Sequence, residues 1–178
     1  MRGRHPILVA AVADVAATAA VFLFSLRHEN SSVYDPYWSV APVPIALYWA
    51  GAGGRGLSAR GALVLLLVAT WGVRLTANWA ARWRGLRDED FRYAEIRGRT
   101  GRLYWPASLI SIHLLPTAWV FLGMLPTFPA LSGPGRPLGA LDLVALAVTA
   151  GAIGVEAVAD LQLRRFLRTR RHPAAVLD

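Results

Sequence analysis

The sequence predicts an all-α membrane protein, a polytopic helix bundle with about five transmembrane helices. Of its 178 residues, 55% are hydrophobic and 17% are charged, whereas soluble domains average about 25% charged residues. All 19 basic residues are Arg, and they gather between long apolar stretches. A basic chain can bind nucleic acid, but charged loops between apolar spans are typical of a membrane protein. We therefore expect the lipid bilayer as a partner and no nucleic acid.

Five apolar segments are candidates for spans, since a transmembrane helix needs about 20 mostly apolar residues. The first runs from Pro6 to Leu26 and contains one charged residue, Asp14. Its apolar run continues past a sequence that resembles a signal-peptide cleavage site, which favours a retained helix. The second, Val40 to Gly53, is short and carries two prolines, so it either crosses with a broken start or re-enters. The remaining spans are expected at Gly61 to Ala77, Tyr104 to Leu125 and Leu138 to about Leu163.

The distribution of Arg predicts the orientation of the chain. Five crossings leave five Arg residues on one side of the membrane and thirteen on the other, with Arg74 inside a span. The positive-inside rule then places the N-terminus outside and the C-terminus in the cytoplasm. We expect a single membrane domain over residues 1–178, multi-pass in the cell membrane, which for a bacterium is the inner membrane. The chain has no Cys, and its His residues lack the spacing of metal ligands, so no metal site is expected.

Charged groups within the last span are the strongest functional signal. A charge at membrane depth is costly, so an ionisable residue there is a functional hypothesis by default. Glu156, Asp160 and Arg164 are spaced by four residues, which places them on one face of a helix. This face suits a polar ligand that enters from the cytoplasmic side. The alternative is an internal salt bridge between Asp160 and Arg164 at a helix end.

Polar and aromatic residues elsewhere allow two interpretations each. Arg74 and Asn78 share a helix face, where Arg74 either serves a site or reaches back to the membrane interface. The Trp and Arg residues of 79–84 suit headgroup depth, and the guanidinium groups also suit phosphates. The aromatic and acidic run 34–38 predicts a substrate entrance or an interfacial aromatic belt. His113 is expected to hydrogen-bond to a neighbouring helix without a functional role.

Five short motifs, in this order along the chain, resemble one group of proteins: Tyr34–Ser39, Trp71–Leu75, Asn78–Trp83, Asp90–Tyr93 and Glu156–Gln162. The group is the bacterial domain-of-unknown-function branch of the steroid 5-alpha-reductase-like superfamily. The resemblance implies a helical membrane protein that uses NADPH to reduce a carbon–carbon double bond conjugated to a carbonyl in a lipophilic substrate.

The resemblance also implies roles for single residues. The expected cofactor-binding residues are Arg74, Asn78, Glu156, Asp160 and Arg164, and the expected catalytic residues are Asp35 and Tyr34. Trp71 stands where the steroid enzymes carry Tyr, and an indole can donate a hydrogen bond but cannot act as a phenolic acid. Tyr34 or Tyr37 is therefore the expected substitute donor.

The chain resembles the N-terminal two-thirds of such a reductase and lacks the C-terminal tract that completes the cofactor site. We therefore expect an incomplete reductase, or alternatively a non-catalytic membrane protein or assembly partner. An ion or proton pathway built on Asp142, Glu156 and Asp160 is a third hypothesis, and a membrane methyltransferase is a fourth.

Overall fold

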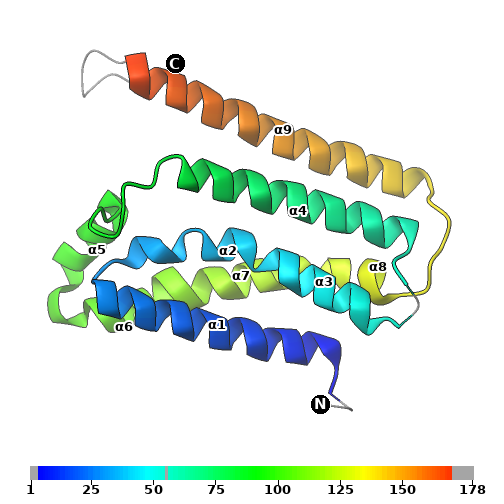
Figure 1. The fold of residues 1–178 in the computed structure, drawn as a ribbon, viewed down its shortest axis with the longest axis horizontal. Helices are drawn as coiled ribbons and strands as arrows, with labels where there is room; N and C mark the ends of the chain where they lie inside the picture. Colours follow the sequence, from blue (N-terminus) through cyan, green and yellow to red (C-terminus); the bar gives the residue numbers. More distant parts are fainter. Residues whose placement is uncertain (1–3, 55, 170–178) are drawn as a thin grey trace. The chain divides into compact units, whose positions relative to one another are not determined.

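The computed structural model describes residues 4–54 and 56–169, and every regular element within them is helical (Figure 1). The chain divides into two compact units, Met1–Pro137 and Leu138–Asp178, so one domain over residues 1–178 stays a prediction. The described elements are α1 (Pro6–His28), η1 (Ser31–Tyr34), α2 (Tyr37–Val40), α3 (Pro42–Ala52), α4 (Ala59–Ala80), α5 (Phe91–Thr100), η2 (Gly101–Leu103), α6 (Tyr104–Ser108), η3 (Leu109–Leu114), α7 (Leu115–Met124), η4 (Leu125–Thr127), α8 (Phe128–Ser132) and, in the second unit, α9 (Ala140–Thr169).

Four stretches of the described chain are long and apolar enough to cross a membrane: Pro6–His28, Ala59–Ala80, Phe91–Ser132 and Ala140–Thr169. This confirms the all-α membrane bundle. The second expected span, Val40 to Gly53, corresponds to α3, whose 11 residues are too few to cross alone, and α2 ends just where the expected span begins. Pro42 and Pro44 cause the break, because each lacks the N–H that would bond to the preceding turn.

The first span begins and ends on local signals. Pro6 stands at the first helical position, which suits its fixed φ, and the His5 side chain accepts a hydrogen bond from the Ile7 N–H. The helix stops at Glu29, which has a left-handed backbone with φ 51°. Asn30 then caps η1 by accepting from the Ser32 N–H at 2.8 Å. This turn sends α2 and α3 back along α1 (Figure 1).

The fourth expected span agrees closely with the structure, because α6, η3 and α7 cover Tyr104–Met124. The middle element, η3, is a π-helical turn that includes His113. The Nδ1 atom of His113 lies 3.0 Å from the Ser108 carbonyl oxygen, which can only accept, so Nδ1 carries the proton. Its Nε2 atom lies 3.0 Å from the Ser25 hydroxyl of α1. The expected hydrogen bond between His113 and a neighbouring helix is therefore confirmed, with Nε2 accepting from the Ser25 hydroxyl.

An apolar cluster holds one end of the first unit together, where α3 packs against α1, α4 and α8. Its buried members are Ala10, Ile45, Ala46, Trp49, Met124 and Leu131. Trp49 is fully buried, and its ring meets Phe121 and Phe128 edge-on at centroid distances of 6.0 and 5.3 Å. Further along, α4 passes α2 at Gly72, where a Cβ atom would lie 2.5 Å from the Ser39 carbonyl oxygen. Only glycine permits that approach.

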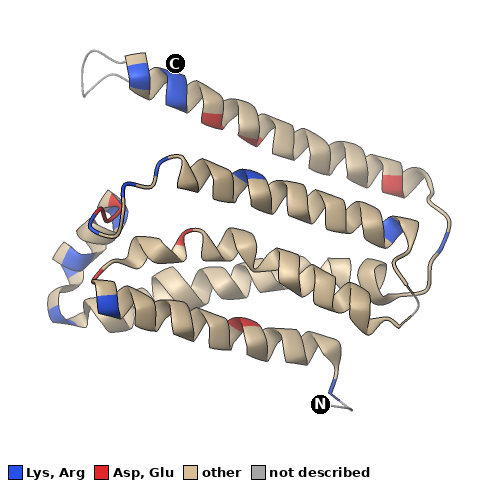
Figure 2. Cartoon of the chain, viewed as in Figure 1, with Lys and Arg blue, Asp and Glu red and all other residues tan. Residues whose placement is uncertain are grey.

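The other end of the first unit is polar. Figure 2 shows many of its charged residues around α5 and the connection that precedes it. The Glu89 carboxylate lies at the centre of this end: it binds Arg97 through both oxygens at 3.0 and 3.1 Å, accepts from the Ser31 N–H at 2.9 Å, and lies 3.2 Å from the Tyr104 hydroxyl. The Arg97 guanidinium also lies 3.9 Å from the centre of the Tyr104 ring.

The second unit is described by α9, none of whose residues is buried. The carboxylate of Asp142 accepts a hydrogen bond from the Gly139 N–H at 2.8 Å and so caps the start of the helix. Glu156, Asp160 and Arg164 lie on this helix, at the spacing that predicted a shared face.

Candidate functional site

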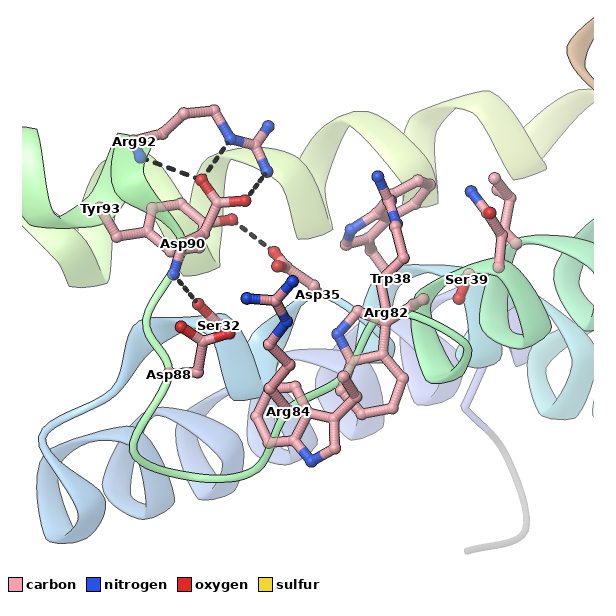
Figure 3. Close-up of a pocket in the computed structure, with 14 residues that line it drawn as sticks. Ser32, Asp35, Trp38, Ser39, Arg82, Arg84, Asp88, Asp90, Arg92 and Tyr93 are labelled. Atoms are coloured by element: carbon pink, nitrogen blue, oxygen red, sulfur yellow. Dashed lines mark hydrogen bonds and ion pairs between the residues drawn. The ribbon is translucent and has the colours of Figure 1, made fainter. Parts of the chain in front are cut away.

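A pocket of about 420 Å³ lies at the polar end of the first unit (Figure 3). The turn after η1, the helix α2, the end of α4 and the start of α5 supply its walls. The residues that line it are Ser32, Asp35, Trp38, Ser39, Leu75, Asn78, Trp79, Arg82, Trp83, Arg84, Asp88, Asp90, Arg92 and Tyr93. Hydroxyl, carboxyl, guanidinium and indole groups therefore face one space.

Asp35 and Tyr93 form a carboxyl–phenol pair in this pocket (Figure 3). Asp35 ends η1 and Tyr93 lies in the first turn of α5, and the Tyr93 hydroxyl donates a short hydrogen bond to Asp35 Oδ1. Burial raises the pKa of the Asp35 carboxyl above its usual value, although the bond from Tyr93 and the nearby Arg92 act in the opposite direction. The carboxyl is thus easier to protonate than an exposed aspartate.

Asp90 is a second carboxyl in the pocket, and its environment shifts its pKa in the opposite direction to that of Asp35. It caps α5 by accepting from the Arg92 N–H at 2.9 Å, and its two oxygens bind the Arg92 guanidinium at 2.8 and 3.0 Å. These bonds lower the pKa of Asp90. Two neighbouring carboxyls whose pKa values move apart are typical of a site where one group holds a proton and the other stays charged.

Arg82 and Arg84 supply the pocket with positive charge. Within the described ranges, neither guanidinium makes a hydrogen bond or an ion pair. Aromatic rings lie near them: the tilted rings of Trp79 and Trp83 are 4.7 Å apart between centroids, and those of Trp38 and Trp71 are 5.9 Å apart. A planar guanidinium binds phosphate or carboxylate through two parallel hydrogen bonds. The pocket can therefore bind an anionic group beside a stacked ring system.

The segment Asn30–Ser32 holds the pocket wall in place. The Asn30 side chain donates to the carbonyl oxygens of Leu86 and Asp88 at 2.8 and 3.1 Å. The Ser32 hydroxyl accepts from the Asp90 N–H at 2.8 Å. These bonds tie the connection between α4 and α5 to the first hairpin of the bundle.

The predicted site residues divide into three sets. Asp35 and Asn78 line the pocket. Tyr34 does not, because it is 1% exposed and its hydroxyl lies 2.8 Å from the Thr117 hydroxyl. Arg74 lies one turn before Asn78 on α4 and is not among the lining residues. The cofactor roles of Glu156, Asp160 and Arg164 on α9 stay predictions.

Sequence reasoning missed Tyr93 as the phenol at the site. It stands 58 residues after Asp35, a separation that carries no local signal. Tyr37, the other expected substitute donor, donates a hydrogen bond from its hydroxyl to the Asp14 carboxylate at 2.6 Å. The sequence did contain Tyr93 in a motif, Asp90–Tyr93, but only the fold shows that this motif faces Asp35.

Comparisons with known proteins found one curated relative and one family model. The chain is 28% identical over 153 residues to an uncharacterized protein, C594.04c, of Schizosaccharomyces pombe. The match covers 83% of this chain and 44% of the yeast protein, so the chain spans less than half the length of that relative. The relative is fungal, and the match therefore gives no support to the expected bacterial origin. No solved structure matches the chain.

A family described as "Protein of unknown function (DUF1295)" matches residues 21–177. This region includes the pocket, the Asp35–Tyr93 pair and α9. The chain therefore belongs to the DUF1295 family.

Proposed function

We propose that the pocket is the catalytic site of a membrane reductase that acts on a carbon–carbon double bond conjugated to a carbonyl. The observation that carries this proposal is the Asp35–Tyr93 pair, a phenol hydrogen-bonded to a partly buried carboxyl at the wall of a polar pocket. The motif resemblance to the steroid 5-alpha-reductase-like superfamily supports the same reaction class. A lipophilic enone is the substrate class that suits a site on a membrane bundle.

The pair can activate a carbonyl oxygen when Asp35 is protonated. When Asp35 is ionised, the Tyr93 hydroxyl donates its hydrogen bond to Asp35 and is not available to the substrate. When Asp35 carries a proton, its O–H donates to the Tyr93 oxygen, and the Tyr93 O–H is released to donate to the substrate. Burial favours this state because it raises the pKa of Asp35. General acid catalysis of this kind contributes about 10²–10⁴-fold to a rate.

The pocket residues fit a nicotinamide cofactor in their chemistry. Arg82 and Arg84 suit its phosphate groups, the indoles of Trp38, Trp79 and Trp83 suit its rings, and the Asn78 side chain suits its amide. NADPH supplies a hydride when it is bound. The pocket residues bind the anionic groups and orient the carbonyl beside Tyr93. Asp35 regains its proton from water.

The test is NADPH oxidation by the full chain in lipid nanodiscs with a conjugated enone. Tyr93→Phe removes the donor and keeps the ring, so we expect turnover to fall by about a hundredfold or more while NADPH binding is unchanged. Tyr48→Phe is the control, because Tyr48 is exposed on α3 and lies outside the pocket. Equal turnover of wild type and Tyr93→Phe would remove the pair from catalysis.

Binding of NADPH is tested separately by energy transfer from the indoles to the nicotinamide. Arg82→Gln and Arg84→Gln should each weaken binding, whereas Arg102→Gln, an exposed basic residue outside the pocket, should not. Asp160→Ala should also weaken binding if the predicted cofactor role of α9 holds. Tight NADPH binding that none of these changes affects would overturn the cofactor assignment.

A further inference from the structure

An apolar groove of about 450 Å³ adjoins the polar pocket. Residues of α1, with Val33 and Leu86, supply its outer walls, and Trp79 and Trp83 line both spaces. The groove is lined by seven residues: Ala20, Val21, Phe24, Val33, Trp79, Trp83 and Leu86. The indole pair of Trp79 and Trp83 thus lines both a charged space and an apolar one.

The groove has a defined position along α1. Its residues Ala20 to Phe24 precede Arg27 and His28, which end the helix. At 1.5 Å per residue, they lie about 5–10 Å further into the span than Arg27. A ligand that occupies both spaces therefore has its polar end near the charged end of the bundle and its apolar part along the span.

The shared wall also contains an unmet donor. Among the described residues the indole N–H of Trp79 is buried without a hydrogen-bond acceptor. A buried donor without a partner is unfavourable. The described groups of the chain therefore leave this donor of the shared lining without an acceptor.

We propose that the substrate is a single-chain amphiphile, with its conjugated carbonyl end in the polar pocket and its flexible apolar chain in the groove. This inference rests on the proposed function, since it names the substrate class of that site. Because Trp79 and Trp83 line both spaces, a polar site and an apolar groove lie side by side, which suits a ligand with one polar end and one apolar end. A compact apolar molecule would fill one space and leave the other to water or lipid.

The experiment uses two enone probes, one with a short alkyl tail and one with a long tail that carries bromine atoms, which quench indole fluorescence on contact. Val21→Phe fills the groove. We expect it to raise the dissociation constant of the long-tail probe about tenfold, which corresponds to about 1.4 kcal/mol, and to leave binding of the short-tail probe and of NADPH unchanged. Val12→Phe is the matched control, because Val12 lies on the exposed surface of the same helix and outside the groove.

Equal affinity of wild type and Val21→Phe for the long-tail probe would overturn the inference. The two proposals fail in different ways. NADPH-dependent reduction that is independent of tail length and of Val21 would refute the amphiphile and retain the reductase. Val21-dependent quenching by a probe that is never reduced would refute the reductase and retain the amphiphile site.

Discussion

At one end of the first unit Trp49 packs among Phe121, Phe128 and aliphatic side chains, whereas at the other end Glu89 binds Arg97, Ser31 and Tyr104. The apolar end encloses no charged side chain in its cluster of described residues. The polar end surrounds a pocket with uncommitted guanidinium groups and two carboxyls of opposite pKa shift. The difference indicates that packing fixes the helices at one end, while directed hydrogen bonds fix the geometry of the site at the other.

Shortening the Trp49 side chain at the apolar end should have the largest effect on the unfolding free energy. Trp49→Ala removes a fully buried ring, and such a change in a core costs about 3–5 kcal/mol. Trp119→Ala, at a position that is 67% exposed on α7, should cost far less. Thermal unfolding in detergent, followed by circular dichroism, measures both.

Trp49→Phe sharpens the same comparison. It keeps most of the ring volume and removes an indole N–H that has no acceptor within the described part of the chain. We expect a change in unfolding free energy within about 1 kcal/mol. A loss as large as that of Trp49→Ala would mean that a benzene ring cannot replace the packing of the larger indole at this end.

Removal of the Glu89 carboxylate at the polar end should have an intermediate effect on the unfolding free energy. Glu89→Ala takes the acceptor from the Ser31 N–H and from Arg97, and leaving buried donors unsatisfied costs about 1–3 kcal/mol. Glu95→Ala breaks the exposed pair with Arg99, where a surface ion pair contributes about 0–1 kcal/mol. Chemical denaturation of both variants provides the measurement, and equal losses would show that Glu89 is not a special anchor.

The pH dependence of stability should show the smallest effect, with opposite signs for the two pocket carboxyls. The folded-state pKa of Asp35 lies above its usual 3.8, so its contribution is greatest below pH 3.8 and is lost as the pH rises through the folded-state pKa. The pKa of Asp90 lies below 3.8, so its contribution is present above pH 3.8 and is lost as the pH falls through the folded-state pKa.

Two isosteric variants separate these contributions. Asp35→Asn should abolish the loss of stability above pH 3.8, and Asp90→Asn should abolish the loss below it. The unfolding free energy of each variant, measured across this pH range and compared with wild type, tests the assignment. An unchanged profile in Asp35→Asn would mean that its carboxyl does not titrate above its usual range.

Much of the helical architecture follows from the sequence. Apolar runs predicted the first, third, fourth and fifth spans, and the structure has helices at each of them. The second span was more difficult because Pro42 and Pro44 interrupt its hydrogen bonds, and the short helix α3 stands in its place. Of the predicted site residues, Asp35 and Asn78 line the pocket, and their catalytic and cofactor roles stay predictions.

The sequence by itself determined the helices, their caps and the apolar character of the chain, because these depend on residues within a few positions of one another. Only the tertiary structure decided that Tyr93, and not Tyr34, faces Asp35, and that Trp79 and Trp83 line both a polar space and an apolar one. Such pairings join residues from separate helices, and hydrophobic periodicity specifies which residues form a helix but not which other helix each of them meets.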